Sequence, residues 1–170
     1  MSREFALGGD PAADARALRD AFGCFTTGVT VVTTRRADGT PVGFTANSFA
    51  SVSLEPPLAL VCVDLAAKSL PALEQAGAFA VNVLHADQRD IARRFTRKEG
   101  DRFEGTPFKT WETGAPVLDG CMANFECETH QAFDAGDHRV FVGRIRKVRI
   151  DPDHQPLVFL RGGYCGVTPG

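Results

Sequence analysis

Small polar side chains gather between Gly43 and Ser53, in a stretch that runs on to Asp64. Written as an extended strand, this stretch has one polar and one apolar face, because successive side chains of a strand point to opposite sides. The pattern indicates a rigid sheet that presents hydroxyl and amide groups. The alternative is a β-hairpin with a solvated face, since Ser and Thr are common on exposed strands. The polar face holds Thr45, Asn47, Ser51 and Ser53, and Ser48 is the polar exception on the apolar face.

Two basic groups could bind an anion. Lys68 and Ser69 stand at the start of a predicted helix, where free backbone N–H groups and the helix dipole favour an anion. The alternative there is an ordinary N-cap beside a surface lysine. The second group, which we call the arginine helix, is either a solvated face or, with Arg102 and Phe103, a phosphate contact. It contains Arg89, Arg93, Arg94, Arg97 and Lys98.

Among the histidines, His138 has the most specific position, because it follows Gly136-Asp137 at the mouth of a predicted hairpin. Without other information, a lone histidine in a turn is usually an exposed residue. No comparable sequence feature supports a functional role for the other histidines, which are His85, His130 and His154. No pair of histidines has the spacing of metal ligands. The five cysteines contain no Cys-x-x-Cys pair, which argues against a disulfide framework or a zinc site. No metal site is therefore predicted.

Hairpins connect most of the predicted strands, with few helices between them, so an antiparallel barrel is favoured over a doubly wound parallel sheet. Asp38-Gly39 is a hairpin signal, and Glu55-Pro56-Pro57 ends the polar stretch. Residues 121–131 alternate sharply and predict a long half-buried strand, with Met122, Asn124 and Glu126 on its polar face. Helices are expected from Pro11 to Gly23, from Ser69 to near Gly77 and from Asp87 to about Thr96, with Asp10, Ser69 and Asp87 as N-caps. Strands are expected at 29–34, 41–45, 58–63, 78–84, 121–131, 139–150 and 156–160.

Length and composition indicate one domain over residues 1–170, with residues 1–12 as a candidate flexible N-terminal segment. A formal net charge of -2 leaves no basic footprint for nucleic acid. No run of about 18 apolar residues and no leader pattern at Met1 are present, so neither membrane insertion nor export is expected. The odd number of cysteines is consistent with a reducing cytoplasm, and Cys62, Cys121 and Cys127 are expected in the core. The usual dinucleotide and Walker glycine motifs are absent, so any nucleotide must be held by other means.

Motifs along nearly the whole chain resemble one family in order and spacing, the short-chain NAD(P)H:flavin oxidoreductases. These are the flavin reductase components of two-component flavin-dependent monooxygenases. The resemblance implies an antiparallel Greek-key split β-barrel of the FMN-binding type, mainly β with short helices, usually a homodimer with flavin near the subunit interface. The motifs are Phe22-Gly23, the Thr27 to Thr34 run, Gly43-Phe44-Thr45, Ser48, Ser51-Val52-Ser53, Pro56-Pro57, the Ala80 to Leu84 run, Arg94-Phe95, Gly136-Asp137-His138 and Arg161-Gly162-Gly163-Tyr164.

The function implied by this resemblance is hydride transfer from NADH or NADPH to FMN or FAD, with delivery of reduced flavin to a partner monooxygenase. Such a transfer needs little side-chain acid–base chemistry, because the two rings mainly need alignment. By resemblance, His138 contacts the nicotinamide nucleotide and is the candidate catalytic residue. The implied cofactor-binding residues are Phe44, Thr45, Asn47 and Ser48 for the flavin ring and ribityl chain, Cys62, Val63, Asp64, Ala67, Lys68 and Ser69 along the ribityl chain and phosphate, and Arg102, Phe103, Gly163 and Tyr164 as further contacts.

A second hypothesis is a non-catalytic flavin-binding split barrel that cannot use NADH. The Gly136-Asp137-His138 and Arg161-Gly162-Gly163-Tyr164 motifs favour the reductase, since a pure binder has no need of a nicotinamide site. The sequence motifs are compatible with FMN and with FAD, and with NADH and with NADPH.

Overall fold

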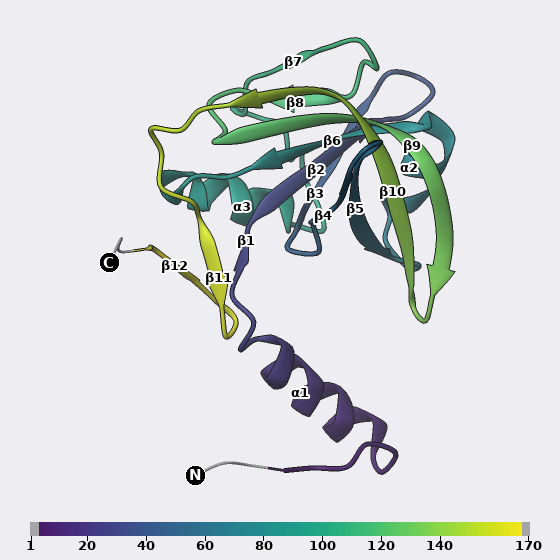
Figure 1. Ribbon diagram of the computed structural model, residues 1–170, viewed down its shortest axis with the longest axis vertical. Coiled ribbons are helices and arrows are strands. Elements are labelled where there is room, and N and C mark those ends of the chain that lie inside the picture. Colours follow the sequence, from purple (N-terminus) through teal and green to yellow (C-terminus); the bar gives the residue numbers. More distant parts are fainter. Residues whose placement is uncertain (1–3, 168–170) are drawn as a thin grey trace.

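Residues 4–167 are described by a computed structural model, and the main feature of this range is a seven-stranded antiparallel sheet (Figure 1). Its strands are β2 (Thr30–Arg35), β3 (Pro41–Ala46), β4 (Ala50–Leu54), β5 (Pro57–Asp64), β6 (Ala78–Val83), β9 (Ala123–Ala135) and β10 (His138–Ile150). They are hydrogen-bonded in the order β3-β2-β6-β9-β10-β5-β4. The prediction of an antiparallel, mainly β chain is confirmed.

The sheet curls into a barrel because two consecutive strands form its opposite edges. β3 lies at one edge and β4 at the other, yet only residues 47–49 connect them. Such a short linker spans at most roughly 14 Å, so the two edges must lie close together. Within residues 4–167 no ladder joins β3 to β4, so the barrel is split there. The stretch that looked like one extended run in the sequence is therefore two strands separated by a turn.

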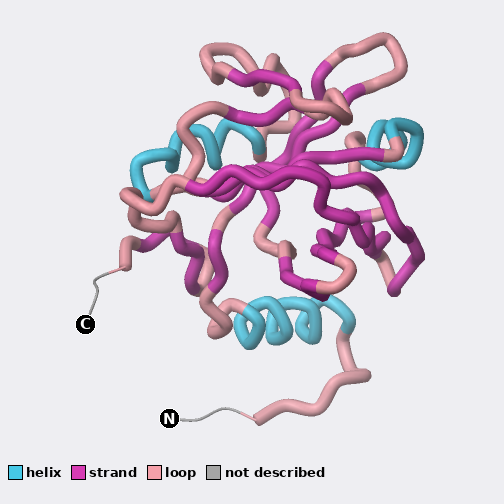
Figure 2. Tube along the Cα trace, turned by 45° about the horizontal axis from the view of Figure 1, so that its top comes forward, coloured by secondary structure: helices cyan, strands magenta, loops and turns pink. Residues whose placement is uncertain are grey.

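A smaller sheet and the first helix extend from the barrel. The sheet contains β1 (Thr27–Gly28), β11 (Val158–Leu160) and β12 (Gly163–Cys165). α1 (Pro11–Phe22) begins and ends where the sequence predicts, since the Asp10 side chain accepts from Ala12 N and Gly23 is the C-cap. Figures 1 and 2 show α1 standing away from the barrel, and none of its residues is buried. No helix within residues 4–167 is long and apolar enough to cross a membrane.

The two other α-helices lie within the sheet connections, and both differ from expectation at their caps. α2 (Leu70–Ala76) has Ser69 at its N-cap position, but the Ser69 side chain makes no capping hydrogen bond. α3 (Arg89–Phe95) follows the 3-10 turn η1 (Ala86–Gln88). The cap of η1 is His85, whose Nδ1 accepts from Asp87 N at 3.3 Å, so the prediction of Asp87 as cap is wrong. Carboxylates are more common caps than imidazoles, which explains the error.

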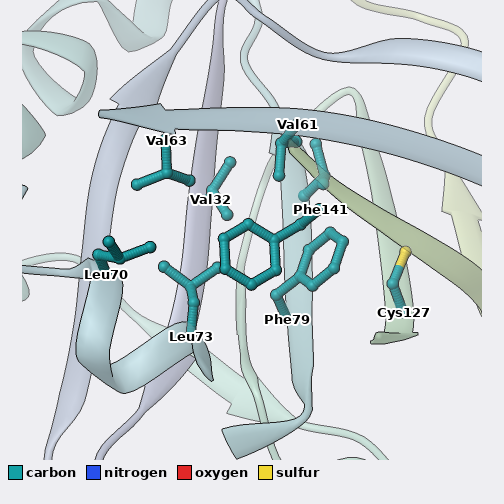
Figure 3. Packing of buried hydrophobic residues seen from close by; sticks show 9 residues of the cluster. Val32, Val61, Val63, Leu70, Leu73, Phe79, Cys127 and Phe141 are labelled. Carbon is teal, nitrogen blue, oxygen red and sulfur yellow. The ribbon is translucent and has the colours of Figure 1, made fainter. Parts of the chain in front are cut away.

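The barrel interior is filled by apolar side chains from β2, β5, β6, β9, β10 and α2, as Figure 3 shows. Gly143 is required at this point, because a Cβ atom there would lie 2.6 Å from Phe79 Cζ. Cys121 and Cys127 are buried as predicted, and burial raises the pKa of their thiols to about 11 and about 12, respectively. The placement of Cys62 in the core is wrong, because its half-buried side chain lines a surface cleft instead.

A buried polar network packs under the short hairpin of β7 (Phe108–Thr110) and β8 (Pro116–Leu118). Asn82 Oδ1 accepts from Leu118 N at 2.9 Å and from Asn124 Nδ2 at 2.8 Å. Glu126 Oε1 accepts from the backbone N–H of Thr113 at 2.8 Å. Asn124 and Glu126 are fully buried, so the prediction of a solvated polar face on β9 is wrong at these two residues, whereas Glu128 and His130 on the same face are exposed. The β7–β8 hairpin covers this part of β9. The alternation of polar and apolar residues along a strand cannot show whether a polar side chain contacts water or a polar group of the protein.

Candidate functional site

The end of β3, the end of β5 and the start of β10 meet around one open cleft of about 620 Å³. β5 and β10 are antiparallel neighbours, and Asp64 is the register partner of His138, so both lie at the same end of the barrel. The cleft is lined by Phe44, Thr45, Ala46, Asn47, Ser48, Cys62, Val63, Asp64, Ala66, Ala67, Lys68, Ser69, Phe95, Thr96, Lys98, Arg102 and His138.

Most of the predicted site residues are therefore brought together, although they come from separate parts of the sequence. Phe103, Gly163 and Tyr164 are the predicted residues that do not line the cleft. The roles of the others as ligand contacts remain predictions.

The hydroxyl group of Ser48 joins the turn between the two sheet edges to β5. Ser48 Oγ donates to the carbonyl oxygen of Cys62 at 3.1 Å and accepts from the Cys62 backbone N–H at 3.0 Å. Ala50 pairs with Leu60 in the β4–β5 ladder, so this hydroxyl continues the pairing to a residue that lies two positions before the start of β4. Its single proton is used inside the protein, which makes Ser48 a part of the cleft wall.

The hydroxyl group of Thr45 is also engaged. Thr45 Oγ1 donates to the carbonyl oxygen of Ala92 at 2.6 Å and thereby attaches α3 to the end of β3. Gly43 allows the same packing, since a Cβ atom there would lie 2.6 Å from Phe95 Cε1. The phenyl ring of Phe95 can therefore reach the barrel and form part of the cleft.

The groups left for a ligand are mainly those of the turn at residues 47–49. Within residues 4–167, the backbone N–H groups of this turn have no backbone acceptor. The exposed Asn47 side chain makes no hydrogen bond in the same range. The turn thus presents backbone donors and one amide to the cleft, while Thr45 and Ser48 hold it in place.

Three cationic side chains line the cleft: Lys68, Lys98 and Arg102. Arg102 Nη1 donates to the carbonyl oxygen of Gly43 at 2.6 Å, which fixes the guanidinium beside β3. The carboxylate of Asp64 also lines the cleft, but its Oδ1 accepts from Ala66 N at 2.7 Å. Burial raises the pKa of the Cys62 thiol, so this group stays protonated and uncharged at neutral pH.

The residues of the arginine helix have two kinds of surroundings, because some contact other groups of the protein and one lines the cleft. Arg94 Nη1 donates to Thr106 Oγ1 at 2.7 Å and to the Glu104 carbonyl oxygen, so Arg94 holds the following loop. Arg93 forms an exposed ion pair with Asp90 at 3.8 Å. Of the group named in the sequence, Lys98 lines the cleft and the arginines do not.

His138 lies at the start of β10, with its ring beside Asp137. Its Nδ1 is 2.7 Å from Asp137 Oδ1, and the carboxylate can only accept, so Nδ1 carries the shared proton and Nε2 is left for a ligand. This hydrogen bond and the histidine charge lower the pKa of Asp137. The backbone carbonyl of Asp137 also accepts from Leu65 N at 2.9 Å, which holds the hairpin against the cleft wall.

Two hollows adjoin the cleft and contain two of the three predicted residues that lie outside it. Phe103 lines a neighbouring groove that also includes Lys68 and Arg102. Tyr164 lines a smaller hollow of about 190 Å³, where its ring packs edge-on against Phe159 at a centroid distance of 5.7 Å. That hollow shares Thr45, Ala46, Asn47 and Thr96 with the cleft, and Gly163 lines neither one.

The sequence prediction missed Phe95 and Thr96 as cleft residues. Arg94-Phe95 is one of the motifs of the resembled family, but the position of Phe95 in the sequence also fits the apolar stripe of an ordinary helix. The contact of α3 with β3 depends on Gly43 and Thr45, which are far away in sequence. In residues 4–167 no group of three or more His, Cys, Asp or Glu side chains is arranged to hold a metal ion.

Comparison with known proteins identifies the family to which the chain is similar. Residues 22–168 match the family described as "Flavin reductase like domain". The "Probable flavin reductase" of Rhizobium meliloti is 45% identical over 89% of this chain, and the chain spans about half, 48%, of that relative. The reductase subunit HsaB of a flavin-dependent monooxygenase from Mycobacterium tuberculosis is 42% identical over 92% of this chain and 84% of its own length.

The fold is shared with solved structures of the same kind. The NADH:FAD oxidoreductase SgcE6 of Streptomyces globisporus, solved in complex with NAD and FAD fragments, is 39% identical to this chain with a TM-score of 0.88. The match covers 96% of this chain and 98% of that protein. The split-barrel architecture is therefore confirmed for nearly the whole chain.

Proposed function

The chain belongs to the flavin reductase-like family, and from this premise we propose that it is an NAD(P)H-dependent flavin reductase that supplies reduced flavin to a separate monooxygenase component. One observation carries the proposal: a single cleft collects the turn at residues 47–49, the cations Lys68 and Arg102, and His138. The donors and charges of this cleft match a flavin phosphate and ring.

The residues of the cleft fit a flavin in size and in chemistry. A volume of about 620 Å³ lies in the range of small-molecule sites. The free backbone donors of residues 47–49 and the Asn47 amide suit the polar edge of the flavin ring, while Lys68 suits its phosphate. Phe44 and Phe95 supply apolar surface to the same cleft.

The protein contributes position rather than acid–base catalysis. A flavin held by the cleft would supply the hydride acceptor, so no protein nucleophile is required. Thr45 and Ser48 fix the turn against α3 and β5, so that the donors of this turn are already oriented before the ligand arrives. His138 and its Nε2 are the groups assigned to the nicotinamide nucleotide.

The proposal includes a homodimer in the cytoplasm. α1 stands free of the barrel with Phe22 72% exposed, and Leu54 of the β4 edge is 93% exposed, so two large apolar side chains lack a cover within residues 4–167. A second copy that covers them would remove this surface from water. The five cysteines are all free thiols, as is usual in a reducing compartment. Light scattering on the purified protein tests the dimer directly.

The function is tested by following NADH oxidation at the nicotinamide absorbance band. We expect turnover with FMN, FAD or riboflavin added, and none without flavin. Turnover that does not depend on flavin would contradict the proposal. Flavin binding without NADH or NADPH oxidation would instead support a binding protein that has lost the reductase step.

A further inference from the structure

The chain between α3 and β7 forms a loop beside the cleft. Residues 97–105 belong to no helix or strand, and we call them the cationic loop. Two of its side chains, Lys98 and Arg102, line the cleft. Residues 97–101 are exposed, so little packing holds the first half of the loop. The position of the two cations therefore depends on the contacts that the rest of the loop makes.

Arg94, in the last turn of α3, holds the far end of the cationic loop. Its Nη1 donates to the carbonyl oxygen of Glu104 and to Thr106 Oγ1, the latter at 2.7 Å. Thr106 is 4% exposed, so this anchor point is itself fixed. Within residues 4–167 the guanidinium of Arg94 makes no ion pair, so these hydrogen bonds are its polar contacts. They close the loop back onto the helix from which it departs.

Two further contacts restrain the second half of the cationic loop. Arg102 Nη1 donates to the carbonyl oxygen of Gly43 at 2.6 Å. The Phe103 ring packs edge-on against Phe95, with ring centroids 5.0 Å apart. The hydrogen bonds of Arg94 restrain the residues that follow directly, so the backbone of Arg102 is also held from its C-terminal side. Without these hydrogen bonds, a longer stretch of chain is free to open locally.

We propose that Arg94 is a positioning residue of the flavin site, which fixes the cationic loop so that the Arg102 guanidinium stands ready at the edge of the cleft. The inference rests on the proposed function. Arg94 does not line the cleft, so it acts on a ligand through another residue. A guanidinium that is already in place loses less conformational freedom when a ligand binds, and this favours binding. Removal of the Arg94 side chain should therefore weaken flavin binding by displacing Arg102.

A double-mutant cycle with Arg94→Ala and Arg102→Ala tests this pathway. Dissociation constants for FMN are measured by fluorescence quenching in the full-length chain. Each single variant should weaken FMN about tenfold, the loss typical of one charge-assisted hydrogen bond. Because both changes act through the same guanidinium, the double variant should bind FMN at most about twofold more weakly than Arg102→Ala alone. Arg94→Lys, which keeps a charged donor, should recover part of the loss.

The matched control is Arg93→Ala, because the ion pair of Arg93 is exposed and lies within α3. This variant should leave FMN affinity unchanged. The loop itself is probed without flavin, by limited digestion of the folded protein with trypsin and mapping of the cut sites by mass spectrometry. Arg97, Lys98 and Arg102 are the tryptic sites in the cationic loop. Arg94→Ala should increase cleavage at these sites severalfold, and the control should not.

The second variant is Thr106→Val, which removes one acceptor of the Arg94 hydrogen bonds and leaves the arginine in place. It should weaken FMN in the same direction, and this effect should disappear in the Arg102→Ala background. This variant keeps the proposal testable if Arg94→Ala does not fold.

Three results would overturn the proposal. The first is a loss in Arg94→Ala that multiplies with the loss in Arg102→Ala, because the two residues would then act independently. The others are an unchanged FMN affinity in Arg94→Ala and an unchanged rate of cleavage in the loop. Failure of the reductase function would appear as absent NADH oxidation with every flavin. The FMN titrations and the digestion need no NADH, so the two failures are distinguishable.

Discussion

At the scale of single residues, the cleft contains polar side chains of two kinds. The hydroxyl groups of Thr45 and Ser48 donate hydrogen bonds to the carbonyl oxygens of Ala92 and Cys62, respectively. The Asn47 amide and the His138 Nε2 have no such partner within residues 4–167. Residues of the first kind shape the site, and those of the second kind can contact a ligand.

His138→Ala should impair use of the nicotinamide nucleotide and leave flavin affinity nearly unchanged. The histidine is on the β9–β10 hairpin, whereas the turn at residues 47–49 is held by β5 and α3. If the imidazole binds NADH equally in the ground and transition states, KM rises alone, and if it aligns the rings, kcat falls as well. Steady-state kinetics with NADH and NADPH measure both, and flavin fluorescence quenching controls for misfolding. An unchanged kcat/KM for both nucleotides would make His138 an ordinary exposed turn residue.

At the scale of elements, the split between β3 and β4 is bridged through the turn that joins them. The Ser48 hydroxyl continues the β4–β5 pairing, and the Thr45 hydroxyl attaches α3 to β3. These few hydrogen bonds connect the site to both edges of the sheet. Loosening them should therefore affect stability and flavin binding together.

Ser48→Ala should lower the free energy of unfolding by about 1 to 2 kcal/mol, because the Cys62 N–H and carbonyl lose their partner. Flavin affinity should fall with it, since the turn is released. The matched variant Asn47→Ala should change stability by less than about 0.5 kcal/mol and still weaken flavin binding. Urea unfolding and fluorescence quenching measure the two quantities. If Ser48→Ala weakened binding at unchanged stability, the hydroxyl would be a direct ligand rather than part of the wall.

At the scale of the whole molecule, His85 couples stability to pH. It caps η1 through Nδ1, and its ring stacks on His154 with centroids 4.3 Å apart. Burial and the His154 charge lower the pKa of His85, while the nearby Asp87 and Asp151 oppose this shift. The neutral ring is the form that can accept the capping hydrogen bond. Protonation therefore removes the cap at the start of the segment that leads to α3.

We expect the free energy of unfolding to decrease as the pH falls below about 6.5, the ordinary pKa of histidine in an unfolded chain. In this range the unfolded state binds the proton more readily than the folded state, so acid favours unfolding until the lowered folded pKa is passed. Urea unfolding at pH 7.5 and 5.5 measures the difference. His85→Asn, which keeps a capping side chain, should reduce the pH dependence, whereas His130→Asn on exposed β9 should keep it. Equal slopes in all three proteins would exclude His85 as the source.

Local patterns in the sequence were sufficient for many of the elements, but not for the assembly of the candidate cleft. Asp10-Pro11 and Gly23 set the ends of α1, Asp38-Gly39 marked the β2–β3 hairpin, and Gly136-Asp137 marked the β9–β10 hairpin. These signals depend on neighbouring residues, so they can be read without the fold. The gathering of Thr45, Lys68 and His138 was expected from motif resemblance alone, because no local pattern relates segments so far apart.

The partners of the polar side chains are visible only in the folded structure. Ser48 bonds to Cys62, Thr45 to Ala92, and Asn82 to Leu118, and in each pair the partner is a backbone group that carries no signal in the sequence. For the same reason the sequence pattern places Asn124 and Glu126 on a solvated face, although both side chains are buried. A side chain's type fixes which hydrogen bonds it can make, whereas the curl of the sheet determines which partners come within reach.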